Sequence, residues 1–126
     1  MDENELSNRV IGAAIEVHRQ IGPGLLESIY QRCLGYELQQ RGISVQSQWT
    51  LPVRYKELEF TGGMRVDLLV ESSLVVELKT VDTMLPVFSA QVLSYLRMSG
   101  LRLGLLINFK VPHLRNGIKR VVNNFR

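Results

Sequence analysis

Two hydrophobic patterns at the start of the chain predict a pair of helices. From Ser7 onward, apolar residues recur mostly every three or four positions, which is the spacing of one face of an α-helix, and Ser7 or Asn8 is a suitable N-cap. A Gly-Pro-Gly sequence at 22–24 ends this pattern. A second pattern of the same kind extends to Arg41, where Gly42 is a natural C-terminal stop. Two amphipathic helices are therefore expected to open the fold.

The middle of the chain changes to the composition of β-strands. Positions 43–55 are rich in β-branched and aromatic residues, and Pro52 among them favours an edge strand or a bulge. Two further strands are expected at 64–71 and 74–80, on either side of a short serine turn. Three consecutive strands joined in this way predict an antiparallel meander.

The last third of the chain predicts one more helix and one or two more strands. Helical spacing returns at 87–99 and ends at Gly100, and the continuous apolar run 103–109 is typical of a strand buried on both faces. Positions 118–122 add a final edge strand. This order of elements predicts an α/β (α+β) fold, a single domain over 1–126 with a mixed central sheet of four to five strands flanked by helices.

Composition narrows the class of protein. The 126 residues are 45% hydrophobic and 21% charged, as in a globular domain, and no apolar run is long enough to cross a membrane. The acidic residues at the start are unlike a secretory leader, and the single cysteine, Cys33, cannot form an internal disulfide, so a cytoplasmic location and a buried, inert thiol are expected.

The charge is distributed unevenly along the chain. Residues 1–82 contain 8 Lys/Arg and all 12 Asp/Glu, whereas residues 83–126 contain 7 Lys/Arg and no acid. A wholly basic segment suits a polyanionic partner, because each neutralised phosphate releases condensed counterions. Many basic faces are only solvated, so the charge by itself leaves the partner open.

The chemistry-bearing residues lie on the second and third predicted strands. Strand side chains alternate, so Glu77 and Lys79 share one face, and Asp67 lies between two apolar residues on the strand before. Asp67 and Glu77 point the same way only if the turn holds three residues or a bulge. With a turn at 72–74, Asp67 faces Lys79 and Leu69 faces Glu77.

This spacing is compatible with two interpretations. Two neighbouring carboxylates bind a hard cation such as Mg²⁺ through oxygen, and an adjacent ammonium stabilises the charge that develops on a phosphate. Alternatively, Asp67 and Lys79 form a cross-strand ion pair while Glu77 faces solvent, as on many half-exposed sheets. Spacing alone leaves both open.

Two helical features favour the first interpretation. Glu27 lies three residues before Tyr30, near the core-facing stripe of its helix, and Gln91 and Tyr95 lie one turn apart on the helix that follows Lys79. Each has a structural alternative: the tyrosines are ordinary core aromatics, and Glu27 simply favours the positive end of its helix.

One segment resembles the signature of a known family. The sequence Gly24-Leu-Leu-Glu27-Ser-Ile-Tyr30 resembles the motif of the GxxExxY proteins, a bacterial and archaeal group within the PD-(D/E)XK nuclease superfamily. The resemblance continues along almost the whole chain, through 11–18, Val76-Glu-Leu-Lys79, Gln91-Val-Leu-Ser-Tyr95, 104–109 and 117–120.

The resemblance implies a restriction-endonuclease-like core and a Mg²⁺- or Mn²⁺-dependent nuclease that leaves 3′-hydroxyl and 5′-phosphate ends, with nucleic acid, first of all DNA, as partner and no membrane. Asp67, Glu77 and Glu27 resemble the metal-binding acids, Lys79 resembles the catalytic lysine, and the backbone carbonyl of Leu78 completes the metal shell. The supporting or substrate-binding residues are Gln91, Tyr95 and Tyr30.

The sequence also departs from the family pattern. Relatives often carry a histidine about three residues before the helical glutamine, where this chain has Phe88, so a substrate or metal contact is missing if that histidine contributes. His18 matches a recurring position but lies in an apolar stripe, which favours a structural role. Lys110, Arg115, Lys119 and Arg120 are candidates for phosphate contacts.

Two other functions stay open at this point. The first is a catalytically silent nucleic-acid-binding module, since a fold does not determine an activity. The second is a protein-interaction subunit, as a homodimer or beside another enzyme, in DNA repair or defence.

Overall fold

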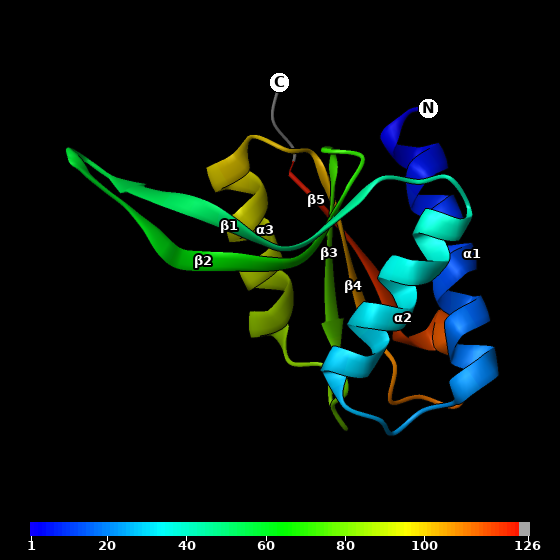
Figure 1. Ribbon diagram of the computed structural model, residues 1–126. Helices are drawn as coiled ribbons and strands as arrows, with labels where there is room; N and C mark the ends of the chain where they lie inside the picture. Colours follow the sequence, from blue (N-terminus) through cyan, green and yellow to red (C-terminus); the bar gives the residue numbers. More distant parts are fainter. Residues whose placement is uncertain (124–126) are drawn as a thin grey trace.

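A five-stranded mixed sheet forms the centre of the computed structural model, which describes residues 1–123 (Figure 1). The elements follow in the order α1 (Glu3–Ile21), α2 (Glu27–Gln40), β1 (Val45–Tyr55), β2 (Leu58–Val70), β3 (Leu74–Lys79), α3 (Pro86–Ser99), β4 (Leu103–Asn108), the 3₁₀ helix η1 (Leu114–Gly117) and β5 (Ile118–Val122). The predicted fold class is confirmed.

The strands lie in the order β1-β2-β3-β4-β5. The first three are antiparallel neighbours, as the meander prediction required, and α3 carries the chain back so that β4 runs parallel to β3. β5 pairs antiparallel with β4 and closes the far edge, as predicted. Pro52 lies on the edge strand β1 and beside a register shift between Leu51 and Val53, so both features expected of this proline occur.

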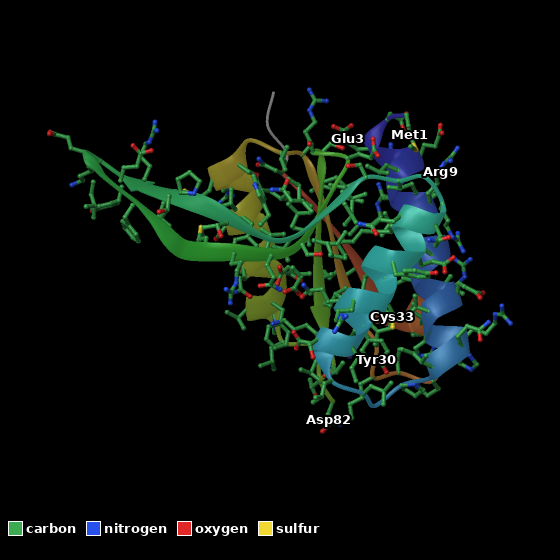
Figure 2. All side chains as sticks on the ribbon, viewed as in Figure 1. Met1, Glu3, Arg9, Tyr30, Cys33 and Asp82 are labelled. Carbon is green, nitrogen blue, oxygen red and sulfur yellow. The ribbon has the colours of Figure 1, made fainter. Side chains whose placement is uncertain are left out.

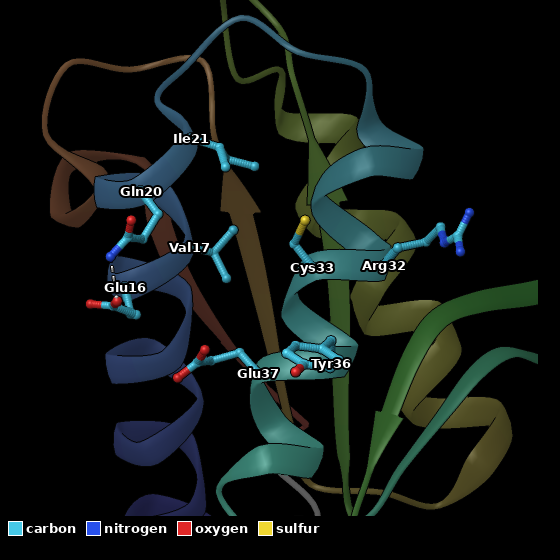
Figure 3. Close-up of a pocket in the computed structure, with 8 residues that line it drawn as sticks. All are labelled: Glu16, Val17, Gln20, Ile21, Arg32, Cys33, Tyr36 and Glu37. Carbon is cyan, nitrogen blue, oxygen red and sulfur yellow. Dashed lines mark hydrogen bonds between the residues drawn. The ribbon is translucent and has the colours of Figure 1, made fainter.

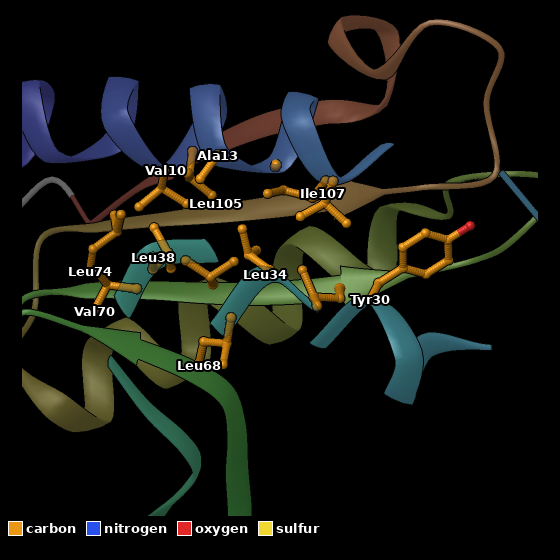
Figure 4. Packing of buried hydrophobic residues seen from close by; sticks show 14 of the residues in the cluster. Val10, Ala13, Tyr30, Leu34, Leu38, Leu68, Val70, Leu74, Leu105 and Ile107 are labelled. Carbon is orange, nitrogen blue, oxygen red and sulfur yellow. The ribbon is translucent and has the colours of Figure 1, made fainter. Parts of the chain in front are cut away.

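The helices divide between the two faces of the sheet. Helices α1 and α2 cover one face, where Leu74, Val76 and Leu78 of β3 point into a core shown in Figure 4. Helix α3 covers the other face and packs against Val75. Every residue of β4 is buried, as expected for a strand between two layers. Alternation along β3 therefore sends Glu77 and Lys79 toward the α3 side.

The first helix begins earlier than its hydrophobic pattern predicted. Asp2 is the N-cap, because its carboxylate accepts a hydrogen bond from the N–H of Glu5 at 2.8 Å. Ser7 is instead buried within the first turns, and its hydroxyl donates to the carbonyl of Asn4. The end of α2 agrees with the prediction: Gly42 has a φ of 76°, and Ile43 N–H donates a hydrogen bond to the Leu38 carbonyl.

The register between β2 and β3 differs from the predicted one by two residues. The turn does hold three residues, but they are 71–73, so Leu69 pairs with Val75 instead of facing Glu77. Glu71 leaves the strand with a φ of 52°, and its carboxylate accepts a hydrogen bond from Ser44 N–H at 2.6 Å. This long-range contact holds the turn at 71–73, and in the observed register Asp67 lies opposite Glu77.

Candidate active site

The side chains of Asp67 and Glu77 connect β2 and β3 just beyond the last backbone pair of the two strands. Backbone pairing runs from Val70 with Leu74 to Leu68 with Val76. Beyond it, Glu77 Oε1 accepts a hydrogen bond from Asp67 N–H at 2.8 Å, and Asp67 Oδ2 accepts one from Leu78 N–H at 2.9 Å. The two carboxylates thus take the place of backbone acceptors, which buried N–H groups require.

The environment of the acidic pair opposes its full ionisation. Glu77 is only 6% exposed, and burial, followed by the nearby Asp67 carboxylate, raises its pKa to about 7. Burial also raises the pKa of Asp67, although the hydrogen bond from Leu78 and the charge of Lys79 act in the opposite direction. The interpretation in which Glu77 faces solvent is therefore wrong.

The raised pKa of Glu77 predicts a specific effect of pH on stability. Between about pH 4.5 and 7 the folded protein binds more protons than the unfolded chain, so stability falls as pH rises through this window. Glu77→Gln keeps an acceptor for Asp67 N–H and removes the buried charge. In thermal unfolding with EDTA we expect it to raise Tm at about pH 8 and to have a smaller effect at about pH 5. The exposed Glu57→Gln is the control, and equal shifts of Tm at both pH values contradict the prediction.

Lys79 lies on the same face of β3 as Glu77 but forms no ion pair with Asp67. Its Nζ lies 4.6 Å from the centroid of the Phe88 ring, at the start of α3. The predicted cross-strand ion pair is therefore wrong. Lys79 nevertheless lowers the pKa values of Asp67, Glu77 and Glu27 through its charge, so all four groups share one electrostatic environment. Phe88, which departs from the family pattern, here contacts the lysine.

The end of β4 holds the backbone that follows Lys79. The carbonyl of Lys79 accepts a hydrogen bond from Phe109 N–H, and the buried amide of Asn108 bonds both the N–H and the carbonyl of Val81. These contacts explain why an asparagine occupies an otherwise apolar run. Through these contacts, the end of β4 fixes the backbone of Lys79 and of the residues that follow it.

Glu27 is the first residue of α2 and is exposed, so its predicted place near the core-facing stripe is wrong. The first residues of α2 lie outside the core, and Tyr30 is the first residue of this helix that is buried. Partial burial and the charge of Asp67 raise the pKa of Glu27, while Lys79 lowers it. Its position at the helix N-terminus also matches the dipole alternative.

Sequence reasoning missed Gln48, whose side chain lies beside Asp67. Gln48 has a φ of 53°, and it lies on β1 between the paired residues Ser47 and Trp49. Its amide donates to Gln31 Oε1 at 2.6 Å, and a hydrogen bond to Asp67 lowers the pKa of that carboxyl. Gln31 and Glu27 are four residues apart on one side of α2. No local pattern marks a polar residue on an exposed edge strand.

The contact of Gln48 predicts a pH-dependent effect on metal affinity. Gln48→Leu removes a hydrogen bond that favours the ionised form of Asp67, so the pKa of Asp67 should rise. We expect Mn²⁺ binding to weaken about tenfold and its pH midpoint to move upward. Calorimetric titration over a pH series measures both. Gln46→Leu, on the same exposed strand, is the matched control, and identical behaviour of the two variants excludes the contact as the cause.

The remaining predicted residues lie at different distances from the acidic pair. Tyr95 is buried on α3, and after burial the carboxylates of Glu77 and Asp67 raise its pKa, so it is close to them. Gln91, one turn earlier, is exposed. Tyr30 is fully buried: it stacks on Phe109 and its hydroxyl donates to the Gly22 carbonyl, which matches the core-aromatic alternative.

The donor set fits a divalent cation. Within residues 1–123 no three acidic, histidine or cysteine side chains are close enough together to form a ready metal centre. However, the half-buried Asp67 lies beside the buried Glu77, and burial raises the pKa of both carboxyls, so a cation close to them would stabilise their ionised forms. Each uses one named oxygen for a backbone N–H, and oxygen is the ligand that Mg²⁺ and Mn²⁺ prefer.

A separate hollow between α1 and α2 contains none of these residues. It has a volume of about 340 Å³, and Val17, Ile21, Cys33 and Tyr36 give it a largely apolar wall (Figure 3). Cys33 is half-buried there, which is less than the full burial expected from the sequence. In the part of the chain that the structure describes, no helix is long and apolar enough to span a membrane.

The fold and comparisons with known proteins define the class of protein. A mixed five-stranded sheet with helices on both faces is the arrangement of restriction-endonuclease-like domains. The sequence matches a family model described as the PD-(D/E)XK nuclease superfamily over residues 4–121, so the chain belongs to this superfamily, and its GxxExxY motif is consistent with that assignment. Nucleases of this superfamily generally use divalent metals.

Comparison with solved structures supports the same fold. The crystal structure of SSO0001 superimposes with a TM-score of 0.59 at 17% sequence identity, over 79% of this chain and 50% of that protein. The chain thus spans about half of its structural neighbour, and the likeness concerns the fold alone. No curated protein sequence matches the chain significantly.

Proposed function

We propose that this chain is a metal-dependent nuclease that hydrolyses phosphodiester bonds, with DNA as the first substrate to test. The observation that carries the proposal is the pairing of half-buried Asp67 with buried Glu77 at the end of the β2–β3 ladder, on the same side as Lys79. Two carboxylates close together, one of them buried, are costly to ionise unless a cation or a proton compensates their charge. A divalent metal ion would provide that compensation, and it is also the ion that assists phosphodiester hydrolysis.

In this mechanism the chain's own residues bind the metal and orient the scissile phosphate. Asp67, Glu77 and Glu27, with the Leu78 carbonyl, would hold Mg²⁺ or Mn²⁺. A bound divalent ion supplies Lewis-acid polarisation of the phosphate and a water of lowered pKa. Lys79 places its ammonium near the phosphoryl oxygens and stabilises their developing negative charge.

Three further residues support this arrangement. Tyr95 closes the α3 side of the acidic pair, and Gln91, exposed one turn earlier, is placed to contact the substrate strand. Tyr30 bonds both the Gly22 carbonyl and Leu25 N–H, and so holds the loop that leads into Glu27. Its role in the proposal is therefore to position Glu27.

The proposal is tested by incubating the protein with labelled single- and double-stranded DNA and RNA in Mg²⁺, Mn²⁺, Ca²⁺ or EDTA. We expect cleavage in Mg²⁺ or Mn²⁺, none in EDTA, and products with 3′-hydroxyl and 5′-phosphate ends that a ligase accepts. Cleavage that persists in EDTA contradicts the metal-dependent mechanism.

Two other results of this experiment would indicate one of the two alternative functions. Binding of nucleic acid with strong salt dependence but without cleavage indicates a silent binding module. Indifference to nucleic acid at low salt, together with migration as a dimer, indicates a protein-interaction subunit.

A further inference from the structure

A continuous series of surface hollows leads away from the C-terminal end of β3. The first is lined by Leu26, Thr80 and Lys110, next in sequence to Glu27 and Lys79. It shares Gly24 and Lys110 with a second hollow, which shares Pro112 with a third. Because each hollow shares a wall with the next, the hollows follow one another along the loop after β4, and we treat them as one grooved surface.

The groove then continues along α1. The third hollow shares Arg115 with a fourth, which reaches Lys119 and Arg120 on β5. The lower end of α1, the loop before α2 and the segment after β4 lie at the same end of the molecule (Figure 1), where Asp82 also lies (Figure 2). We call this feature the basic groove, and its far part is lined by Arg19, His113, Arg115, Lys119 and Arg120.

The lining of the basic groove carries charge of one sign. No Asp or Glu is among the described residues that line the four hollows. The part of the lining that follows β4 is acid-free because no Asp or Glu occurs after Asp82 in the sequence. A groove with cationic and without anionic walls attracts a polyanion.

The structure distinguishes the cations that are available from those already engaged. Arg120 bonds the side chains of Ser7 and Asn4, Lys110 forms an ion pair with Asp82 at 2.8 Å, and Arg19 is paired with Glu16. By contrast, within residues 1–123 Arg115 and Lys119 make no side-chain hydrogen bond or ion pair. These two exposed cations are free to bind phosphate oxygens.

The floor of the basic groove is held in place by buried contacts. His18 Nε2 lies 2.8 Å from the Val111 carbonyl, which ties the loop after β4 to α1. Leu114 of η1 is 4% exposed and packs in the core. A ligand therefore meets a preformed surface, and binding costs little ordering of the backbone.

The length of the groove suits several consecutive phosphates. Its contacts along α1 extend from Ile11 to Arg19, which at a rise of about 1.5 Å per residue is about 12 Å. Phosphates of one strand recur about every 3.4 Å along a duplex axis, so this part faces about three of them.

We propose that the basic groove binds the backbone of the nucleic-acid strand that extends from the Asp67–Glu77 site, with Arg115 and Lys119 contacting its phosphates. This inference rests on the proposed nuclease function, since it places the strand relative to that site. It predicts that affinity depends on strand length beyond the scissile bond and on the charge of these two residues.

The test compares Arg115→Ala/Lys119→Ala with wild type in binding to fluorescent DNA and RNA strands of about 6 and 20 nucleotides, in Ca²⁺, over a series of salt concentrations. We expect the slope of log K against log salt to decrease by about 1.4 for single strands, as two phosphate contacts are lost. The long strands should lose affinity and the short ones should not.

A double variant with the same change of charge is the control. Arg32→Ala/Arg97→Ala removes two exposed arginines from α2 and α3, outside the groove. Measurement of the unfolding temperatures checks that both variants are folded. An equal loss of affinity in the two double variants, or no loss in the groove variant, overturns the proposed groove.

Hydrolysis of a small phosphodiester tests the proposed nuclease function independently of the groove. Bis(p-nitrophenyl) phosphate is too short to reach the groove, so its hydrolysis in Mn²⁺ reports on the acidic site alone. If the groove variant hydrolyses it as wild type does but binds long strands poorly, both proposals stand. If wild type cuts neither the diester nor DNA while the groove variant still loses affinity, the nuclease proposal fails and the groove is a binding surface.

Discussion

Lys79→Ala is expected to lower the rate of phosphodiester cleavage by about 10² to 10³-fold, because it removes the ammonium that stabilises the developing phosphoryl charge. Lys79 is placed for this role by three features of the structure: its face of β3 is the one that carries Glu77, its carbonyl is held by Phe109, and its ammonium lies over Phe88. Cleavage of labelled DNA under single-turnover conditions measures the effect.

Metal affinity distinguishes this role from a structural one. Lys79 lowers the pKa values of the acids through its charge and donates nothing to their backbone bonds. Mn²⁺ should therefore still bind to the Lys79→Ala protein, which should fold normally. Lys56→Ala, at the exposed tip of the β1–β2 hairpin, is the matched control. A Lys79→Ala protein that cuts DNA at the rate of wild type contradicts the proposed chemistry.

Asp67 is expected to give the second large effect, and two substitutions separate its functions. Asp67→Ala removes the acceptor of the buried Leu78 N–H, so we expect a loss of about 1–3 kcal/mol in the free energy of unfolding. Asp67→Asn keeps an acceptor oxygen but loses the charge, so it should unfold near the wild-type temperature. Both variants should lose measurable Mn²⁺ binding and cleavage.

Denaturant unfolding in EDTA and calorimetric Mn²⁺ titration provide the two measurements. Ser47→Ala, on the neighbouring strand β1, controls for a general effect of shortening a side chain near the site. If Asp67→Asn binds Mn²⁺ as tightly as wild type, Asp67 is a structural acceptor and not a metal ligand. If Asp67→Ala and Asp67→Asn lose the same stability, the hydrogen bond to Leu78 contributes little.

The acidic pair and the free cations of the basic groove come from different parts of the sequence. Residues that would handle the reacting phosphate come from the first two-thirds of the chain, where all the acids lie. The uncompensated cations Arg115 and Lys119 come from the acid-free last third. The Asp82–Lys110 ion pair lies between these regions and is largely exposed, so it costs a bound phosphate little to displace it.

The sequence by itself determined the order of the helices and strands and the faces of the strands, although β2 begins at Leu58 and not at the predicted position 64. Helical and strand periodicity depend on local geometry, so the order of helices and strands, the meander, the buried β4 and the edge position of Pro52 were all predictable. The placement of Glu77 and Lys79 on one face follows from alternation along a single strand. Because the sequence also gives the residue types, two carboxylates and a lysine could be identified as candidate site residues from the sequence.

Only the tertiary structure decided how these groups meet. In the observed β2–β3 register the turn begins at Glu71, directly after β2, and its carboxylate accepts a hydrogen bond from Ser44 N–H, 27 residues away. Gln48 reaches Asp67 because its backbone adopts a left-handed conformation within an edge strand. The basic groove joins α1 to the segment after β4 through His18 and Val111. Such contacts join residues far apart in the chain, and no local periodicity encodes which of them pack together.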